Sequence, residues 1–326
     1  MTIQHNYSHI QATKKLVETI GLDQIKELHT ENRFLDILAI IVIWTTLLAM
    51  VYLLGTLEFG LTWVICFIFQ GFVMQWLVFC SHDLFTHRKV GGAGFSRLMA
   101  IIFHTPILLS GTAVMKTHMD HHKMFGVKGD SEEYKIDLDR RWVKILFLTL
   151  PGIILVTNRK FMKSKGESEG YMGSKRHKDE KLKSKILDEQ KIVIVFLFSI
   201  VALFFFFPNY LVYGYILPLL FSLPFASTLR TLLEHANIDK ENPYQNSTYY
   251  KTGFVTKFLF FWGTGDCHIV HHFFPSIPFY QMNKALKLIR PIIDASGAHQ
   301  TKSITWILKK WFIENKPHGT RWELPS

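Results

Sequence analysis

The stretch GDCHIVHHFFPSIP, from Gly265 to Pro278, is the part of the sequence that most constrains the fold. Its three histidines, His268, His271 and His272, stand at positions i, i+3 and i+4, so on a helix they fall within an arc of about 100°. One helix face would then carry three imidazole rings. Because imidazole is the commonest side-chain metal ligand, the stretch predicts a helix that helps to hold a metal ion.

Two further stretches are rich in histidine. HMDHH repeats the same spacing with His118, His121 and His122, whereas HDLFTH holds His82 and His87 five residues apart. On an α-helix, residues five apart point about 140° away from each other. Either these two histidines flank the metals, or the helix ends or bulges between them. The three stretches hold eight of the chain's 16 histidines, which favours one shared site.

The composition is that of a membrane protein, since 48% of the 326 residues are hydrophobic and 28 are Phe. Apolar runs at Leu35–Leu54 and Phe59–Cys80, and again at Ile192–Phe207 and Leu211–Thr228, are each separated by only three or four residues. Each pair therefore predicts a transmembrane hairpin, although Ile192–Phe207 is short for a span.

The basic residues predict the orientation of these hairpins. All 37 Lys and Arg lie in residues 1–34, 81–191 and 230–326, and none lies in the hairpins at 35–80 and 192–229. By the positive-inside rule, both termini and every histidine stretch are cytosolic. The expected fold is thus an all-α integral membrane protein of one domain, residues 1–326. Four transmembrane helices in two hairpins would support a cytosolic helical cap that holds a histidine-rich dimetal site.

Several segments of the cap allow more than one interpretation. Residues 1–34 predict an amphipathic helix that either lies on the membrane surface or packs on the cap. Leu98–Leu109 and Val143–Val156 are too short to cross and are expected to be interfacial or re-entrant. Asn158–Lys191 is highly charged, which indicates a linker or a solvated helix.

The net charge of +11 is explained by this one-sided distribution and by attraction to anionic membrane lipids, and we do not expect nucleic-acid binding. The three cysteines form no disulfide framework, which fits a reducing compartment.

His235, in LEHAN, follows the fourth predicted span and is the expected ninth ligand. A set of imidazoles without an obvious thiolate favours iron, copper, zinc or nickel, and more than four of them suggest two ions. Asp130 and Asp266 are the carboxylates most expected to accept the far N–H of a ligating imidazole, ahead of Asp83, Asp120 and Glu234.

The ordered set HDLFTH, HMDHH, LEHAN and HIVHHFFPSIPFY, with two hairpins between, resembles the membrane fatty acid desaturase family, the histidine-box desaturase and hydroxylase superfamily. The resemblance covers roughly Leu35 to Tyr280. It implies a cytosolic cap with a non-haem di-iron centre that uses O2 and two electrons to attack an unactivated C–H bond of a lipid chain. It also implies a water-mediated or hydrogen-bonding role for Asn237. The implied iron ligands are His82, His87, His118, His121, His122, His235, His268, His271 and His272.

The third box begins with His268 where the front-end desaturases carry glutamine, and the chain has no HPGG haem-binding stretch. We therefore expect a separate electron donor, a ferredoxin or a protein of the cytochrome b5 type, attracted by the basic cap. The expected membrane is a bacterial inner membrane or the endoplasmic reticulum.

The expected activity is desaturation of a fatty acyl chain, with a hydroxylase or a carotenoid ketolase or hydroxylase of the same superfamily as the alternative. Two other classes fit less well. A metal transporter would place its ligands near the bilayer midplane, whereas the predicted spans hold no histidine. A membrane-anchored metal-dependent hydrolase would need an open coordination position and a general base such as Asp120.

Overall fold

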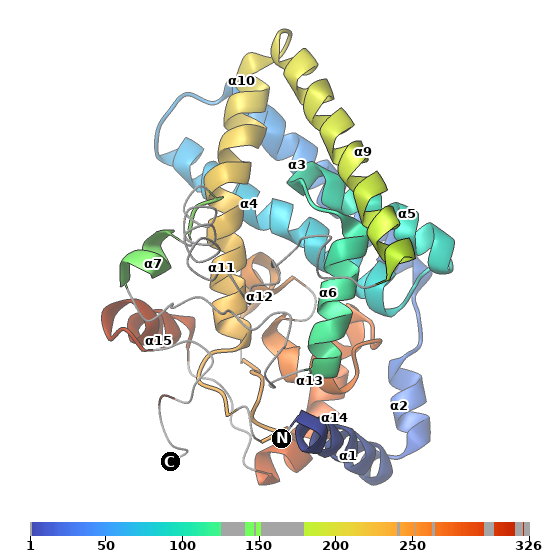
Figure 1. Ribbon diagram of the computed structural model, residues 1–326. Coiled ribbons are helices and arrows are strands. Elements are labelled where there is room, and N and C mark those ends of the chain that lie inside the picture. Colours follow the sequence, from blue (N-terminus) through green and yellow to red (C-terminus); the bar gives the residue numbers. More distant parts are fainter. Residues whose placement is uncertain are drawn as a thin grey trace, which may run out of the picture. The chain divides into compact units, whose positions relative to one another are not determined.

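The computed structural model is helical, and no strand occurs in the part of the chain that it describes (Figure 1). This agrees with the predicted all-α class. The predictions for Asp130, for half of Val143–Val156 and for residues 158–178 lie outside the described residues. Those are 2–124, 141–146, 148–150, 179–239, 242–250, 252–262, 265–296, 303–316 and 322.

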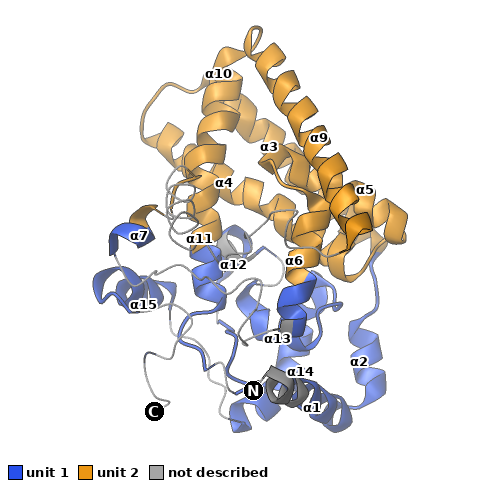
Figure 2. Cartoon of the chain, in the orientation of Figure 1, with its two compact units in different colours: residues 1–32, 119–144, 229–326 blue, residues 33–118, 145–228 orange. Residues whose placement is uncertain are grey.

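The chain divides into two compact units, coloured separately in Figure 2. Unit 1 comprises residues 1–32, 119–144 and 229–326, and unit 2 comprises residues 33–118 and 145–228. Residues 81–118, which we expected in the cap, therefore group with the apolar hairpins.

Unit 2 contains the first predicted hairpin. Helices α3 (Arg33–Thr56) and α4 (Leu61–Ser81) pack against each other, and their ends lie within two residues of the predicted ones. By length and composition, the helical stretches Leu22–Thr56, Leu61–His87 and Pro208–Glu234 could each cross a membrane. These stretches support the prediction of a membrane protein.

The stretch Pro208–Glu234 is interrupted by π-helical turns. Pro218 has no N–H and cannot bond the carbonyl of Gly214 in an α-helical ladder. The buried side chain of Gln70 in α4 donates to that carbonyl at 3.1 Å. A Cβ on Gly71 would lie 2.3 Å from the backbone of Ser222, so glycine is required for this close approach. The elements in order are α10 (Pro208–Leu211), η4 (Val212–Ile216), η5 (Pro218–Ser222) and α11 (Leu223–Glu234).

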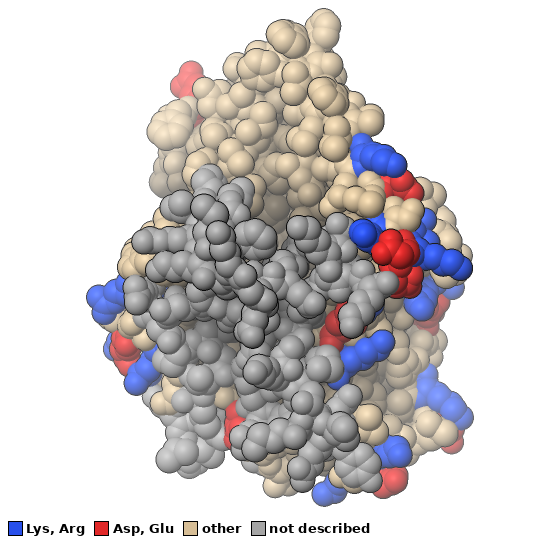
Figure 3. All heavy atoms as spheres, viewed as in Figure 1, with Lys and Arg blue, Asp and Glu red and all other residues tan. Residues whose placement is uncertain are grey.

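Helix α9 (Glu180–Phe204) begins 12 residues before the third predicted span. Asp179 caps it by accepting the backbone N–H groups of Lys181 and Leu182. Residues 180–191 of the charged segment Asn158–Lys191 are therefore helical and not a linker. Its other end is apolar and exposed: Phe205 and Phe206 are 79% and 76% accessible. Figure 3 shows that the surface around this end carries almost no charge. Because its first half is charged, α9 is not among the helical stretches apolar enough to cross a membrane. The crossing at Ile192–Phe207 therefore stays a prediction.

The predicted re-entrant piece at Leu98–Leu109 lies at a sharp bend. Helices α5 (Ala93–His104) and α6 (Gly111–Met124) are separated by the 3-10 turn η2 (Thr105–Ile107) and, taken together as one apolar segment, are bent by 103°. A broken span or a re-entrant loop both fit this geometry.

Unit 1 is built around an apolar cluster that includes the N-terminal helices α1 (Thr2–Ile20) and α2 (Leu22–Leu28). Leu16 and Leu28 are fully buried in it, so of the two alternatives for residues 1–34 the structure has the helices packed on the protein itself. The other elements are α7 (Arg141–Leu146, which extends into unit 2), α12 (Phe254–Phe261), η6 (Gly265–Cys267), α13 (His268–Phe273), η7 (Phe279–Gln281), α14 (Met282–Ala295), α15 (Ile304–Leu308) and η8 (Lys309–Ile313).

Candidate metal centre

The first histidine box forms a π-helix, η1 (His82–His87), that continues directly from α4. Its ladder bonds run from i to i+5, as in the bond from the Arg88 N–H to the Asp83 carbonyl at 3.3 Å. Residues five apart therefore come to lie on one face. The rings of His82 and His87 have their centroids 4.7 Å apart. Of the alternatives that the spacing left open for these two histidines, the structure has the bulge.

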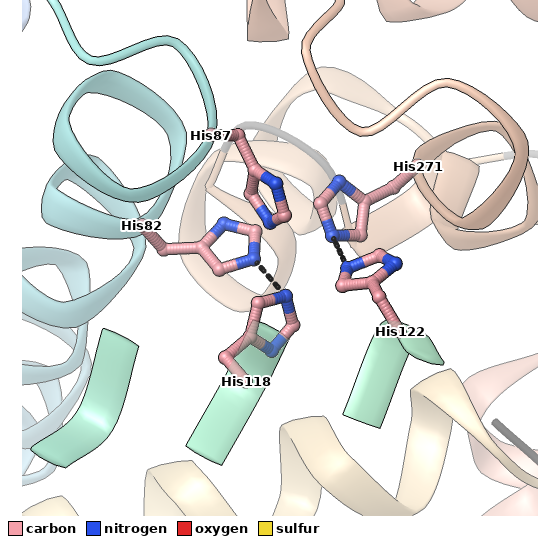
Figure 4. Close-up of side chains that lie close together, drawn as sticks. All are labelled: His82, His87, His118, His122 and His271. Atoms are coloured by element: carbon pink, nitrogen blue, oxygen red, sulfur yellow. Dashed lines mark hydrogen bonds between the residues drawn. The ribbon is translucent and has the colours of Figure 1, made fainter. Parts of the chain in front are cut away.

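Unit 2 brings three of the predicted ligands together. The Nε2 atoms of His82 and of His118 in α6 lie 2.7 Å apart, as Figure 4 shows. The ligand atoms of His82, His87 and His118 all lie within 4.8 Å of one another. Three imidazoles from two segments of unit 2 could therefore share a metal ion.

A buried charge cluster holds η1 in unit 2. Arg88 donates to both carboxylate oxygens of Asp36, at 2.8 and 2.7 Å, and to Asp83 at 3.2 Å. The three side chains are at most 4% exposed. Because Asp36 lies at the start of α3, this cluster ties the first span to the box. Sequence reasoning missed the contact, although a lone acidic residue at the edge of an otherwise uncharged span was its signal.

Unit 1 brings together the other six histidines, from α6, from the end of α11 and from α13. The Nε2–Nε2 distance is 3.0 Å between His122 and His271 (Figure 4). It is 3.2 Å between His235 and His268, and 3.1 Å between His268 and His272, which lie one helical turn apart. The ligand atoms of His121, His235 and His272 lie within 4.8 Å of one another.

Two carboxylates of unit 1, Glu234 and Asp266, have different neighbours. Glu234 is the carboxylate beside a histidine: its Oε1 lies 3.6 Å from Nδ1 of His268 and accepts from Arg230 at 2.7 Å. Asp266 instead pairs with Lys257 at 3.0 Å and Thr252 at 3.2 Å. 

The side chain of Asn237 accepts the backbone N–H of Trp322 at 2.6 Å. Any role of Asn237 or Asp266 toward a metal stays a prediction.

The chemistry of the two groups fits a metal ion. Burial and the neighbouring imidazoles of His268, His122, His121 and His235 hold the pKa of His272 well below its usual range. His272 is therefore neutral at pH 7, which is the form that binds a metal. An all-nitrogen donor set suits iron as well as zinc, copper or nickel.

Helical stretches that could cross a membrane, together with two groups of converging imidazoles, define the class: a helical protein of the membrane type whose histidine boxes could bind metal. The sequence matches the family model described as fatty acid desaturase over residues 79–303. Since this match covers well over half of the chain, the protein belongs to the fatty acid desaturase family, and that membership makes it an oxidoreductase. Members typically hold two iron ions, and the histidine groups described above could bind metal. No match was found among the curated proteins compared.

Proposed function

We propose that this protein is an O2-dependent fatty acyl desaturase whose nine clustered histidines hold two iron ions. The observation that carries the proposal is the approach of imidazole Nε2 atoms to one another, at 2.7 to 3.2 Å, within both histidine groups. Helix α6 supports it further, because one continuous helix carries His118 of the first group and His121 and His122 of the second.

The reaction takes two hydrogen atoms from adjacent methylenes and leaves a double bond. With two electrons from a donor protein and two protons from solvent, it reduces O2 to two molecules of water. Iron would supply the activation of O2, which no side chain of the protein can provide. Burial keeps His272 neutral, and Glu234 and Arg88 are placed to fix two of the segments that carry box histidines.

The partners follow from the same proposal. The substrate is an acyl chain delivered from the membrane, and a separate ferredoxin or cytochrome b5-type protein supplies the electrons. We place both termini and the histidines on the cytosolic side, because all 37 Lys and Arg lie outside the predicted hairpins.

The test is expression in a host that lacks the activity, with and without His271→Ala, followed by mass spectrometry of total lipids and of a supplied carotenoid. We expect acyl chains that have lost two hydrogens in the wild type alone, and about two iron ions per chain that the variant fails to retain. The matched control is His29→Ala, because the ring of His29 bonds the preceding turn, at the Ile25 carbonyl. This variant should keep both the desaturation and the iron.

A product that has gained one oxygen would instead indicate the hydroxylase, or with carotenoid the ketolase or hydroxylase, of the same superfamily. Purified protein that binds zinc and acts without O2 would refute the proposal in favour of a hydrolase.

A further inference from the structure

Glu189 is a carboxylate in α9 that is 2% exposed and far in sequence from every histidine box. It accepts four hydrogen bonds. Ser110 Oγ donates at 2.6 Å, the Thr112 backbone N–H at 2.8 Å, and Arg97 Nε at 3.2 Å; the Thr112 hydroxyl makes the fourth, shorter contact. A carboxylate so buried and so fully paired costs much to place there, which indicates a specific task.

Its donors surround the beginning of α6. The first N–H groups of a helix have no partner within the helix, and the positive end of the helix dipole favours an anion. Here Ser110 Oγ accepts the N–H of Ala113 at 3.1 Å and Glu189 accepts that of Thr112. Thus the start of the helix that carries three box histidines is capped by a residue from a different helix.

The same carboxylate also holds the other side of the bend, because Arg97 belongs to α5. At the bend, a Cβ on Gly111 would lie 2.6 Å from the backbone of Ala100, so α5 and α6 are in backbone contact there. Glu189 therefore fixes α6 to α5 and to α9 at a single point. His118 lies six residues, or about 9 Å, along α6 from Thr112.

We propose that Glu189 is a positioning residue that fixes the axial position and rotation of α6, and through α6 the placement of His118, His121 and His122. A rotation of one residue step, about 100°, would turn all three rings away from their partners. The inference rests on the proposed function insofar as these histidines hold iron, but the anchoring of α6 can be measured without iron.

The test compares Glu189→Ala and Glu189→Gln with Ile186→Ala in the purified full-length protein. Ile186 is the matched control, since it lies on the same helix and is 1% exposed but contributes only apolar packing. Amide hydrogen exchange at Thr112 to Val114 is measured on metal-free protein, and iron affinity and the spectrum of the iron site are measured on loaded protein.

We expect Glu189→Ala to exchange about tenfold faster at these amides, to bind iron about 10- to 100-fold more weakly, and to change the iron spectrum. Glu189→Gln should have an exchange rate and an iron affinity between those of the wild type and of Glu189→Ala, because the glutamine keeps one oxygen acceptor. Ile186→Ala should lower the unfolding temperature and leave exchange in α6 and the spectrum unchanged.

Unchanged exchange in Glu189→Ala, or equal changes in Ile186→Ala, would overturn the proposal. If the wild type holds no iron, the proposed function fails, while the exchange result still decides whether Glu189 anchors α6.

Discussion

The two histidine groups use the same ligand but are built differently. In unit 2, His82 and His87 stand five residues apart on a π-helix that a buried Arg88 ties to two carboxylates. In unit 1, His268, His271 and His272 stand three and four apart on an α-helix whose other side is packed in apolar residues. A π-helix brings residues five apart onto one face, as an α-helix does residues three and four apart. The support of the segment differs too: a buried charge cluster holds η1, whereas α13 packs on an apolar cluster.

The largest effect should come from breaking the charged support. In Arg88→Met, Asp36 and Asp83 are left buried without their cation, and we expect a loss of about 3–5 kcal/mol in the free energy of unfolding. Desaturation should be lost as η1 moves. Denaturant unfolding in detergent and iron content measure the two effects.

Asp36→Asn is the variant to compare with Arg88→Met. In Asp36→Asn, Arg88 is still present and keeps Asp83 and the asparagine oxygen as acceptors. The loss of unfolding free energy in Asp36→Asn should be clearly smaller than in Arg88→Met. If both variants match the wild type in stability, the charge cluster does not support the box.

The apolar support can be weakened through the N-terminal helix. Leu16 is fully buried in the cluster that contains Ile269 and Val270 of α13, so Leu16→Ala should cost about 3 kcal/mol. Thermal unfolding measures this. Lys284→Ala removes the exposed ion pair with Glu27 and should change stability by less than about 1 kcal/mol. Equal losses in the two variants would mean that surface charge at α2 holds the N-terminal helices as strongly as the apolar packing of Leu16 does.

The smallest effect should distinguish two carboxylates of unit 1, Glu234 and Asp266. Glu234→Gln weakens the support of His268, and we expect an iron affinity about tenfold lower, equivalent to about 1.4 kcal/mol. Asp266→Asn alters contacts with Lys257 and Thr252 and should leave iron affinity within about twofold of the wild type. Competition with a chelator measures the iron affinity of both variants. If Asp266→Asn bound iron more weakly than Glu234→Gln, Asp266 would be the carboxylate that supports a histidine.

Much of this architecture could be predicted because its signals are local. The helical spacing in HMDHH and HIVHH and the first hairpin each follow from fewer than about 50 consecutive residues, whereas HDLFTH left open whether the helix ends or bulges. The contacts that hold these segments join residues far apart in the chain, as Arg88 and Asp36 or Glu189 and Thr112 do. A single sequence can mark one member of such a pair, as it marks Asp36, but it does not identify the partner. Nor did it indicate that Asp266 pairs with Lys257.

The start of α9 was less predictable than the ends of α3 and α4. The third span was placed by hydropathy at Ile192, but α9 starts at Glu180 because Asp179 caps it and its charged first half is fully compatible with a helix. Hydropathy reports where lipid begins, whereas capping reports where a helix begins, and the two need not coincide.

The π-helix at His82–His87 also bears on how such a site could arise and be lost. A ladder that runs from i to i+5 accommodates one residue more than an α-helix over the same turn. A single codon inserted between two histidines four apart on an ordinary α-helix would thus leave them on one face, five apart, where a π-turn takes up the extra residue. An in-frame deletion of one residue between His82 and His87 would return them to a spacing of four, which an α-helix also brings to one face. The π-turn therefore lets this segment differ in length by one residue while both rings stay on the face that they share.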